Sequence, residues 1–169
     1  VTPTSVTLEW GPATEAGNVF EQLCLALIDT GRIDEAERRL AALPPRAAAD
    51  WTWQRQVAWV RTEAALWGGR PQRAVELAEQ ILSGPQGDAN LAFARVSRAW
   101  ALFDLGQDPA PPVTGSYPAM LAAVPEETAG ICLFHDGSAA AAVDAFDGAS
   151  VTWGVCHRRG ELRCGWAAG

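Results

Sequence analysis

Apolar residues recur along this chain at intervals of three and four, the spacing that places side chains on one face of an α-helix. The interval appears first in residues 19–28 and again in residues 33–43, on either side of Gly31. Pro44 and Pro45 follow, and proline cannot continue a helix because it lacks the amide hydrogen. The pattern therefore predicts a helical hairpin that turns at Gly31 and ends before the two prolines.

The hairpin pattern recurs further along the chain. Residues 57–67 and 74–81 carry the same interval on either side of Gly69, and a third helix over residues 93–103 ends before Gly106. The turn glycines stand 38 and then 37 positions apart. A period in this range is typical of stacked helical pairs.

Helix-start signals agree with this period. Asp50 and Asp88 stand where N-caps are needed, and Pro71 suits the first turn of a second helix. A fourth turn is predicted at Gly137, with a helix start at residues 125–127 before it and an Ala-rich helix behind it. The polar and proline positions thus predict the same four units as the apolar interval.

The predicted second helices also align with one another. Five positions after the turn glycine stands Ala36, Ala74 or Ala142, and a small residue there lets two helices approach closely. The third unit departs from this pattern, because Pro111 and its neighbouring prolines would break a helix. We therefore expect an irregular connector over residues 107–124.

These elements predict an all-α fold, a right-handed α-α superhelix of helical hairpins that spans residues 1–169 as a single domain. One hairpin buries too few apolar side chains to offset the entropy of ordering its backbone, so the pairs must stack. Stacked pairs leave a continuous concave wall of first helices, which repeat proteins commonly use for binding. We expect a binding function and no enzymatic activity.

Composition narrows the possible partners. The chain has 169 residues, 49% of them hydrophobic, and a formal net charge of -7. An acidic chain lacks the positive field that concentrates on phosphate backbones, so we expect no direct nucleic-acid binding. All its basic residues are arginines, which excludes a phosphate loop of the GxxxxGK type within these residues.

Nothing in the sequence predicts export or membrane association. No leader pattern and no apolar run of membrane-spanning length is present. We expect a cytoplasmic protein with no membrane partner. The sequence opens without Met and reaches Gly169 within a helical pattern, so we expect a segment of a longer chain.

The motif Gly-x-x-x-x-Ala-x-x-x-(Phe/Leu/Ala)-x-x-(Ala/Ile/Leu), after an amphipathic helix, resembles the tetratricopeptide repeat (TPR), and three of the four units fit it. Residues 63–71 (EAALWGGRP) and 160–169 (GELRCGWAAG) are further similar to the degenerate helical repeats of large LuxR-type bacterial transcriptional regulators. That resemblance implies a repeat region between an ATP-binding module and a C-terminal DNA-binding helix-turn-helix. Neither module has its motifs in these residues.

The candidate binding residues lie on one predicted first helix. Eight tryptophans occur in the chain, and those at 53, 59 and 67 do not share one helix face, so at least one should be partly exposed. Aromatic contacts and polar groups that could fix an acidic ligand or partner are Trp53, Arg55, Trp59, Arg61 and Glu63. The alternative is core packing for the tryptophans and a solvated face for the charges.

Cysteine and histidine positions predict packing rather than chemistry. Cys156, His157 and Cys164, with Cys132 and His135, could be read as metal ligands, but the chain holds no Cys-x-x-Cys pair. We expect reduced thiols, no metal and no cofactor. His135 suits a helix C-terminus, and Cys164 is expected to pack against a helix outside this chain.

Charged residues on the second helices predict solubilising pairs at helical spacing. They are Glu35, Glu37, Glu76 and Glu79 with Arg38, Arg39 and Arg73. No two carboxylates stand together in an apolar sequence setting, so general acid-base chemistry has no support here.

Three hypotheses follow. The first is a regulatory or sensor segment of a LuxR-type regulator that binds a small-molecule effector, a protein or a neighbouring domain and relays to a DNA-binding domain outside this chain. The second is a free-standing TPR-like scaffold that holds a protein or peptide in its groove. The third is a small metal-dependent enzyme that uses the Cys and His cluster near residue 157.

Overall fold

The computed structural model of this chain describes residues 13–43, 51–84, 89–109, 111, 121–154 and 158–168. Within these residues the fold is helical and contains no strand, which confirms the predicted all-α class. The helices are α1 (Ala13–Asp29), α2 (Ile33–Ala41), α4 (Trp51–Trp67), α5 (Pro71–Leu82), α6 (Ala89–Asp104), α7 (Val124–His135), α8 (Ala139–Gly154) and α9 (Arg158–Ala168).

All four predicted turn glycines end their helices in the left-handed conformation, with φ of 74°, 68°, 64° and 79° at Gly31, Gly69, Gly106 and Gly137. Each turn closes in the same way. The glycine N–H reaches the carbonyl three residues back, and the next N–H reaches the carbonyl five residues back, as Arg70 does to Ala65 at 2.9 Å. This is the Schellman motif, which favours glycine because it has no Cβ.

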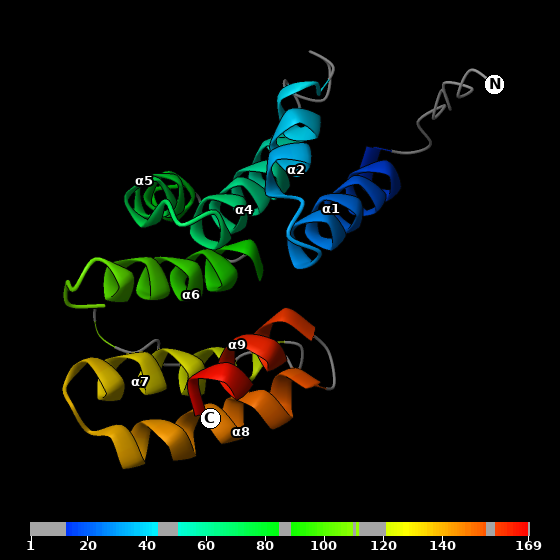
Figure 1. Ribbon diagram of the computed structural model, residues 1–169. Helices are drawn as coiled ribbons and strands as arrows, with labels where there is room; N and C mark the ends of the chain where they lie inside the picture. The colour runs from blue at the N-terminus through cyan, green and yellow to red at the C-terminus, as the bar shows by residue number, and fades with distance from the viewer. Residues whose placement is uncertain are drawn as a thin grey trace.

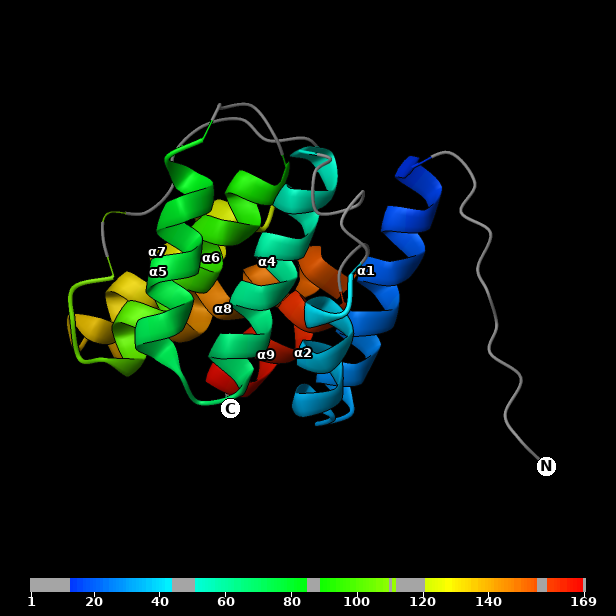
Figure 2. The same ribbon diagram turned by 90° about the horizontal axis from the view of Figure 1, so that it is seen from above.

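The helices form a stack in which each second helix packs between two first helices. Helix α2 contacts α1 and α4, α5 contacts α4 and α6, and α8 contacts α7 and α9. Figure 1 shows the stack descending from α1 and α2 through α4, α5 and α6 to α7 and α8, with α9 beside α8. From above, the axes of α1, α2, α4 and α5 run roughly alongside one another (Figure 2).

The aligned positions of the second helices are buried, as the repeat predicts. Ala36, Ala74 and Ala142 are at most 1% exposed. The residues nine positions after the turn glycine are also in the core, namely Leu40, Ala78 and Phe146. The small side chains therefore lie where the helices approach one another.

The third unit departs from the hairpin pattern in its described residues, as its prolines predict. Residues 107–109 and 111 are not helical, and α7 begins at Val124 with Pro125 in its first turn. Helix α6 packs directly on α7. Residues 110 and 112–120 of the connector and the two predicted N-caps, Asp50 and Asp88, lie outside the described residues.

Aromatic side chains join the units across this irregular point. The ring of Phe93 on α6 lies 4.9 Å from Trp59 on α4 and 5.9 Å from Trp153 on α8. Trp100, also on α6, stacks on Phe146 of α8 at 5.6 Å. Helix α6 therefore connects the hairpin of α4 and α5 with the hairpin of α7 and α8.

None of the helices in the described part of the chain has both the length and the apolar character needed to cross a membrane.

Candidate functional site

A carboxylate is buried on the apolar face of α4. Glu63 is 1% exposed and stands one helical turn from Val60 and Trp67 on that face. Its Oε1 accepts a hydrogen bond from the Ser97 hydroxyl of α6 at 2.5 Å. Its Oε2 accepts one from the indole N–H of Trp67 at 3.3 Å. These bonds replace the water that Glu63 loses on burial.

A second carboxylate, Glu127, is buried on α7. It is fully inaccessible to solvent. The indole N–H of Trp100 donates to Oε1 at 2.8 Å and that of Trp153 donates to Oε2 at 2.6 Å. Two tryptophans, one from α6 and one from α8, therefore hold the carboxylate.

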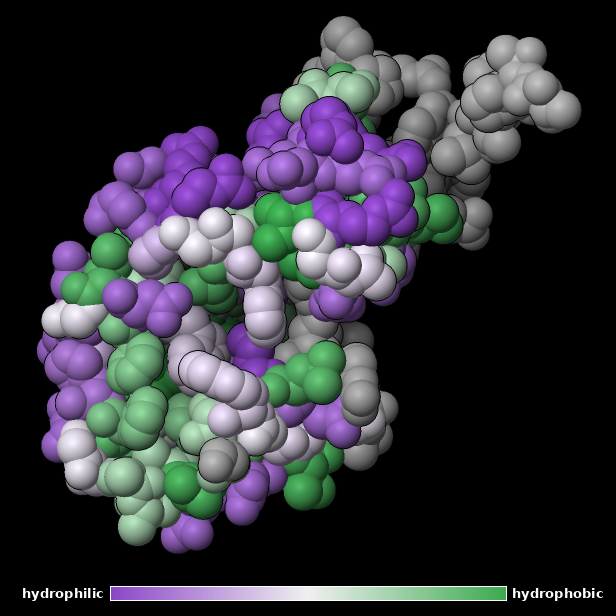
Figure 3. All heavy atoms as spheres, viewed as in Figure 1, coloured by the Kyte–Doolittle hydropathy of each residue, from purple (hydrophilic) through white to green (hydrophobic). Residues whose placement is uncertain are grey.

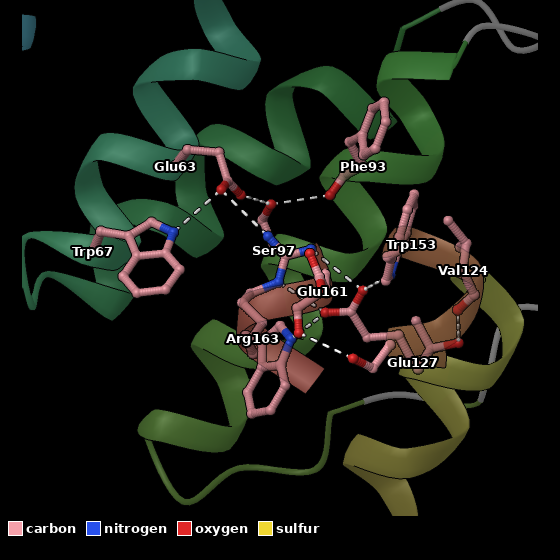
Figure 4. A network of polar contacts seen from close by, with 12 residues as sticks. Glu63, Trp67, Phe93, Ser97, Val124, Glu127, Trp153, Glu161 and Arg163 are labelled. Carbon is pink, nitrogen blue, oxygen red and sulfur yellow. Dashed lines mark hydrogen bonds and ion pairs between the residues drawn. The ribbon is translucent and has the colours of Figure 1, made fainter. Parts of the chain in front are cut away.

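Arg163 of α9 joins the two carboxylates. Its Nε and Nη2 donate to the two oxygens of Glu127 at 2.8 and 3.3 Å, which is a bidentate pair. Its Nη1 lies 3.4 Å from Oε2 of Glu63. Figure 4 shows the guanidinium between the two carboxylates. The network of Glu63, Ser97, Glu127 and Arg163 thus connects α4, α6, α7 and α9.

The network is electrically unbalanced, with two carboxylates around one guanidinium. Burial alone would lower the pKa of Arg163, but the charges of Glu127 and Glu63 and the hydrogen bond to Glu127 raise it above its usual range. Arg163 is therefore permanently charged. Burial, with the neighbouring Glu127 carboxylate, raises the pKa of the Cys164 thiol, so Cys164 stays a protonated and unreactive thiol.

A pocket of about 500 Å³ opens beside this network, between the C-terminal ends of α4 and α6 and the side of α9. It is lined by Leu66, Trp67, Gly69, Trp100, Asp104, Leu162, Arg163 and Trp166. In Figure 3 a hollow with hydrophilic atoms at its base lies between α9 and the helices above it. A volume of this size suits a small organic molecule.

Three tryptophans, one from each helix, form the aromatic wall of the pocket. Trp166 is 80% exposed and Trp67 is 45% exposed, whereas Trp100 is buried. The exposure of Trp67 confirms the prediction that the tryptophans of α4 could not all be covered. Asp104 provides a carboxylate in the wall, and burial raises its pKa.

The residues singled out from the sequence separate into different environments. Trp53 and Trp59 are 4% and 3% exposed and lie in the core against Phe20 and Phe93. Glu63 enters the buried network, so the alternative of a solvated face is wrong for this residue. Arg61 is exposed.

A second hollow collects two of the predicted residues. Trp53 and Arg61 line a space of about 340 Å³ with Leu40, Leu43 and neighbouring residues of α2 and α4. Arg61 also donates a hydrogen bond to the Leu40 carbonyl at 3.2 Å. Arg55 lies in α4, and its side chain is outside the described residues.

Two expectations from the sequence are wrong. Glu63 and Glu127 do stand together in an apolar interior, although they are 64 positions apart in the chain. Cys164 packs inside this chain, in the cluster with Phe146 and Trp153. On α9 the exposed apolar residues are instead Leu162 and Trp166.

One signal could have identified the network residues. Glu63 and Glu127 stand at apolar positions of their helices, Glu63 between Val60 and Trp67 and Glu127 between Val124 and Ile131. Buried glutamates need partners, so these positions require a cation. The sequence offers no local signal that Arg163 is that cation.

The predicted surface pairs are present in part. Arg39 contacts Glu35 at 3.1 Å and Arg73 contacts Glu76 at 2.8 Å. Two further glutamates reach between helices instead, Glu37 to Arg70 and Glu79 to Arg98. All of these pairs are at the surface.

No three His, Cys, Asp or Glu side chains within the described ranges are arranged to hold a metal ion. Cys156 and His157 lie outside the described residues. His135 ends α7, as predicted, with its Nδ1 3.5 Å from Asp136.

Comparison of this chain with known protein families, curated proteins and solved structures found no match.

Proposed function

We propose that this chain is a TPR-like α-α superhelical segment that binds a small-molecule effector in the pocket between α4, α6 and α9. Its parent would be a cytoplasmic LuxR-type transcriptional regulator, and the segment would relay the effector to a DNA-binding domain outside this chain. Three observations support this proposal. They are the order in which the helices pack, the four glycine turns, and the resemblance of residues 63–71 and 160–169 to LuxR-type repeats.

One observation carries the binding proposal: Arg163 belongs both to the pocket wall and to the buried network. Its guanidinium binds Glu127 of α7, in the hairpin of α7 and α8, and approaches Glu63 of α4, in the hairpin of α4 and α5. A ligand packed on α9 would therefore favour the arrangement in which Arg163 bridges the two. A ligand shifts a conformational equilibrium only through such differential contacts.

Binding is tested with N-phenyl-1-naphthylamine, an uncharged aromatic dye whose fluorescence rises in apolar sites. We expect saturable binding that Leu162→Glu abolishes, because Leu162 lines the pocket. Val151→Glu is the matched control, since Val151 is also exposed and apolar but lies on α8, away from the pocket. Equal loss in both variants, or no saturation, would remove the pocket as a binding site.

The relay is tested by hydrogen exchange with and without the bound dye. We expect slower amide exchange in α9 and in the part of α4 around Glu63, because both ends of the network are then held together. Protection limited to the pocket rim would support binding without relay. The regulator assignment further predicts that the coding sequence beyond Gly169 encodes a basic helix-turn-helix.

A different observation favours a second candidate function. Trp53 and Arg61 line the hollow between α2 and α4, and the exposed guanidinium of Arg61 suits an acidic peptide segment. A peptide-binding scaffold would use this surface. A library of acidic peptides should then bind the chain, and Arg61→Ala should abolish that binding while leaving the dye site intact.

A further inference from the structure

The charged groups around the pocket favour one sign of ligand. Asp104 lies in the wall, and Glu63 and Glu127 lie behind it. Arg163 is the one cation among these four groups. Among these four groups three carboxylates stand against one guanidinium, so together they favour a positively charged ligand.

Arg163 offers little to an anionic ligand. All three of its guanidinium nitrogens already face the glutamates, Nε and Nη2 at Glu127 and Nη1 at Glu63. An anion in the pocket would have to compete with two buried carboxylates for them. Asp104, by contrast, forms no hydrogen bond or ion pair within the described part of the chain, and a cation would relieve the cost of its partial burial.

The aromatic lining of the pocket suits a cation as well. The indole N–H groups of Trp67 and Trp100 donate to Glu63 and Glu127. Trp67 and Trp166 both line the pocket and are 45% and 80% exposed. The face of an indole carries the negative lobe of its quadrupole, which attracts ammonium groups.

We infer that the effector pocket selects a small amphipathic organic cation, with an apolar or aromatic body and one ammonium group between the Trp67 and Trp166 rings and Asp104. This inference rests on the proposed function, because it names the ligand class of the same pocket. The body would lie against Leu66 and Leu162.

The test uses three probes of similar size that differ in charge: benzyltrimethylammonium, its uncharged carbon isostere neopentylbenzene, and benzylsulfonate. Binding to the 169-residue chain is followed by tryptophan emission and by calorimetry. We expect the ammonium probe to bind about tenfold more tightly than neopentylbenzene and benzylsulfonate not to bind measurably. The affinity for the ammonium probe should fall with added salt, whereas that for neopentylbenzene should not.

Asp104→Asn separates the charge contribution from the shape of the pocket. Asp104 is exposed enough for the variant to fold, which a thermal melt checks. The affinity of the variant for the ammonium probe should be about five- to tenfold lower, and its affinity for neopentylbenzene should be unchanged. Asp144→Asn makes the same change of charge at an exposed position of α8 and should alter neither affinity.

Each outcome is informative. Equal binding of the ammonium probe and neopentylbenzene would overturn the cation inference and leave the effector pocket standing. Tighter binding of benzylsulfonate would overturn the inference, because the pocket would then select an anion. Failure of all three probes, together with failure of the dye, would remove the pocket itself. A dimer that Trp166→Ala dissociates would assign the pocket to a second copy of the chain and overturn the inference.

Discussion

The Nε of Arg163 lies 2.8 Å from Oε1 of Glu127, and this bond ties α9 to the interior of α7. Helix α9 otherwise packs mainly on α8. The pair therefore fixes where α9 sits and, with it, the wall of the pocket. Because both members of the pair are buried, we expect replacing one of them to lower the stability of the fold strongly.

Replacing Arg163 with Met should destabilise the fold strongly. The substitution leaves two buried carboxylates without their cation, which typically costs about 3–5 kcal/mol. Urea unfolding measures the loss. Arg39→Met is the control, because its pair with Glu35 is at the surface and is worth about 1 kcal/mol or less. Adding Glu63→Gln and Glu127→Gln to Arg163→Met should recover part of the stability, and similar losses for the two single variants would contradict a buried network.

Gly160 should tolerate no side chain. A Cβ there would lie 2.4 Å from Cγ of Trp153, the same indole that donates to Glu127. Gly160→Ala should therefore cost about 1–3 kcal/mol by overpacking. Gly165→Ala in the same helix meets nothing closer than 3.7 Å and should be neutral or stabilise by about 0.5–1 kcal/mol. Thermal melts of the two variants compare them directly, and a neutral Gly160→Ala would show that α9 sits differently against Trp153.

Ala74 tests the repeat register. It is fully buried where α5 meets its neighbours, so Ala74→Phe should destabilise by about 1–3 kcal/mol. Ala140 is exposed on α8, and Ala140→Phe serves as the control. An unchanged melting temperature for Ala74→Phe would mean that the aligned alanines are not the contact points of the repeat.

Glu21 should make stability depend on pH. Burial raises its pKa from 4.5 to about 7, so the folded state holds the proton more tightly than the unfolded state. Below about pH 4.5 both states are protonated and Glu21 imposes no penalty; above about pH 7 both are ionised and the penalty is complete. Stability from this group therefore falls as the pH rises from about 4.5 to about 7.

Urea unfolding of the native chain and of Glu21→Gln across that range isolates the effect. The variant should gain stability relative to the native chain as the pH rises. Asp144→Asn, at an exposed site, should show a constant difference. If the difference in stability between Glu21→Gln and the native chain were also constant with pH, Glu21 would be exposed to water rather than buried.

The acidic surface predicts that this segment alone does not shift duplex DNA at physiological salt. The formal net charge is -7, and nonspecific binding depends on releasing counterions through basic groups. An electrophoretic mobility assay checks this. Salt-sensitive binding below micromolar concentrations would contradict it and would weaken the assignment of DNA binding to another domain.

Much of the fold could be predicted from the sequence because its determinants are local. The apolar interval, the glycine at each turn and the prolines of the connector act within a few residues. Gly137 shows this well: its helix pair was predicted from a proline, a glycine and an alanine run, and its φ is 79°.

The candidate site could be predicted only in fragments. The sequence predicts Glu63 as a polar group for a ligand or partner, or as part of a solvated face, and its burial excludes the solvated face. Trp53 and Trp59 were selected for their ring chemistry, but their position in the helix register places them in the core. Helical spacing shows which residues share a face, but it does not show what covers that face.

The sequence by itself determined the class of fold and the position of the turns, because each of these depends on neighbours three to five residues apart. Only the tertiary structure decided that Arg163 meets Glu63, from which it is separated by 100 positions, and Glu127, from which it is separated by 36. That meeting depends on how α9 packs against α8 in the folded stack. Buried charges are stable only where the whole stack brings their partners together.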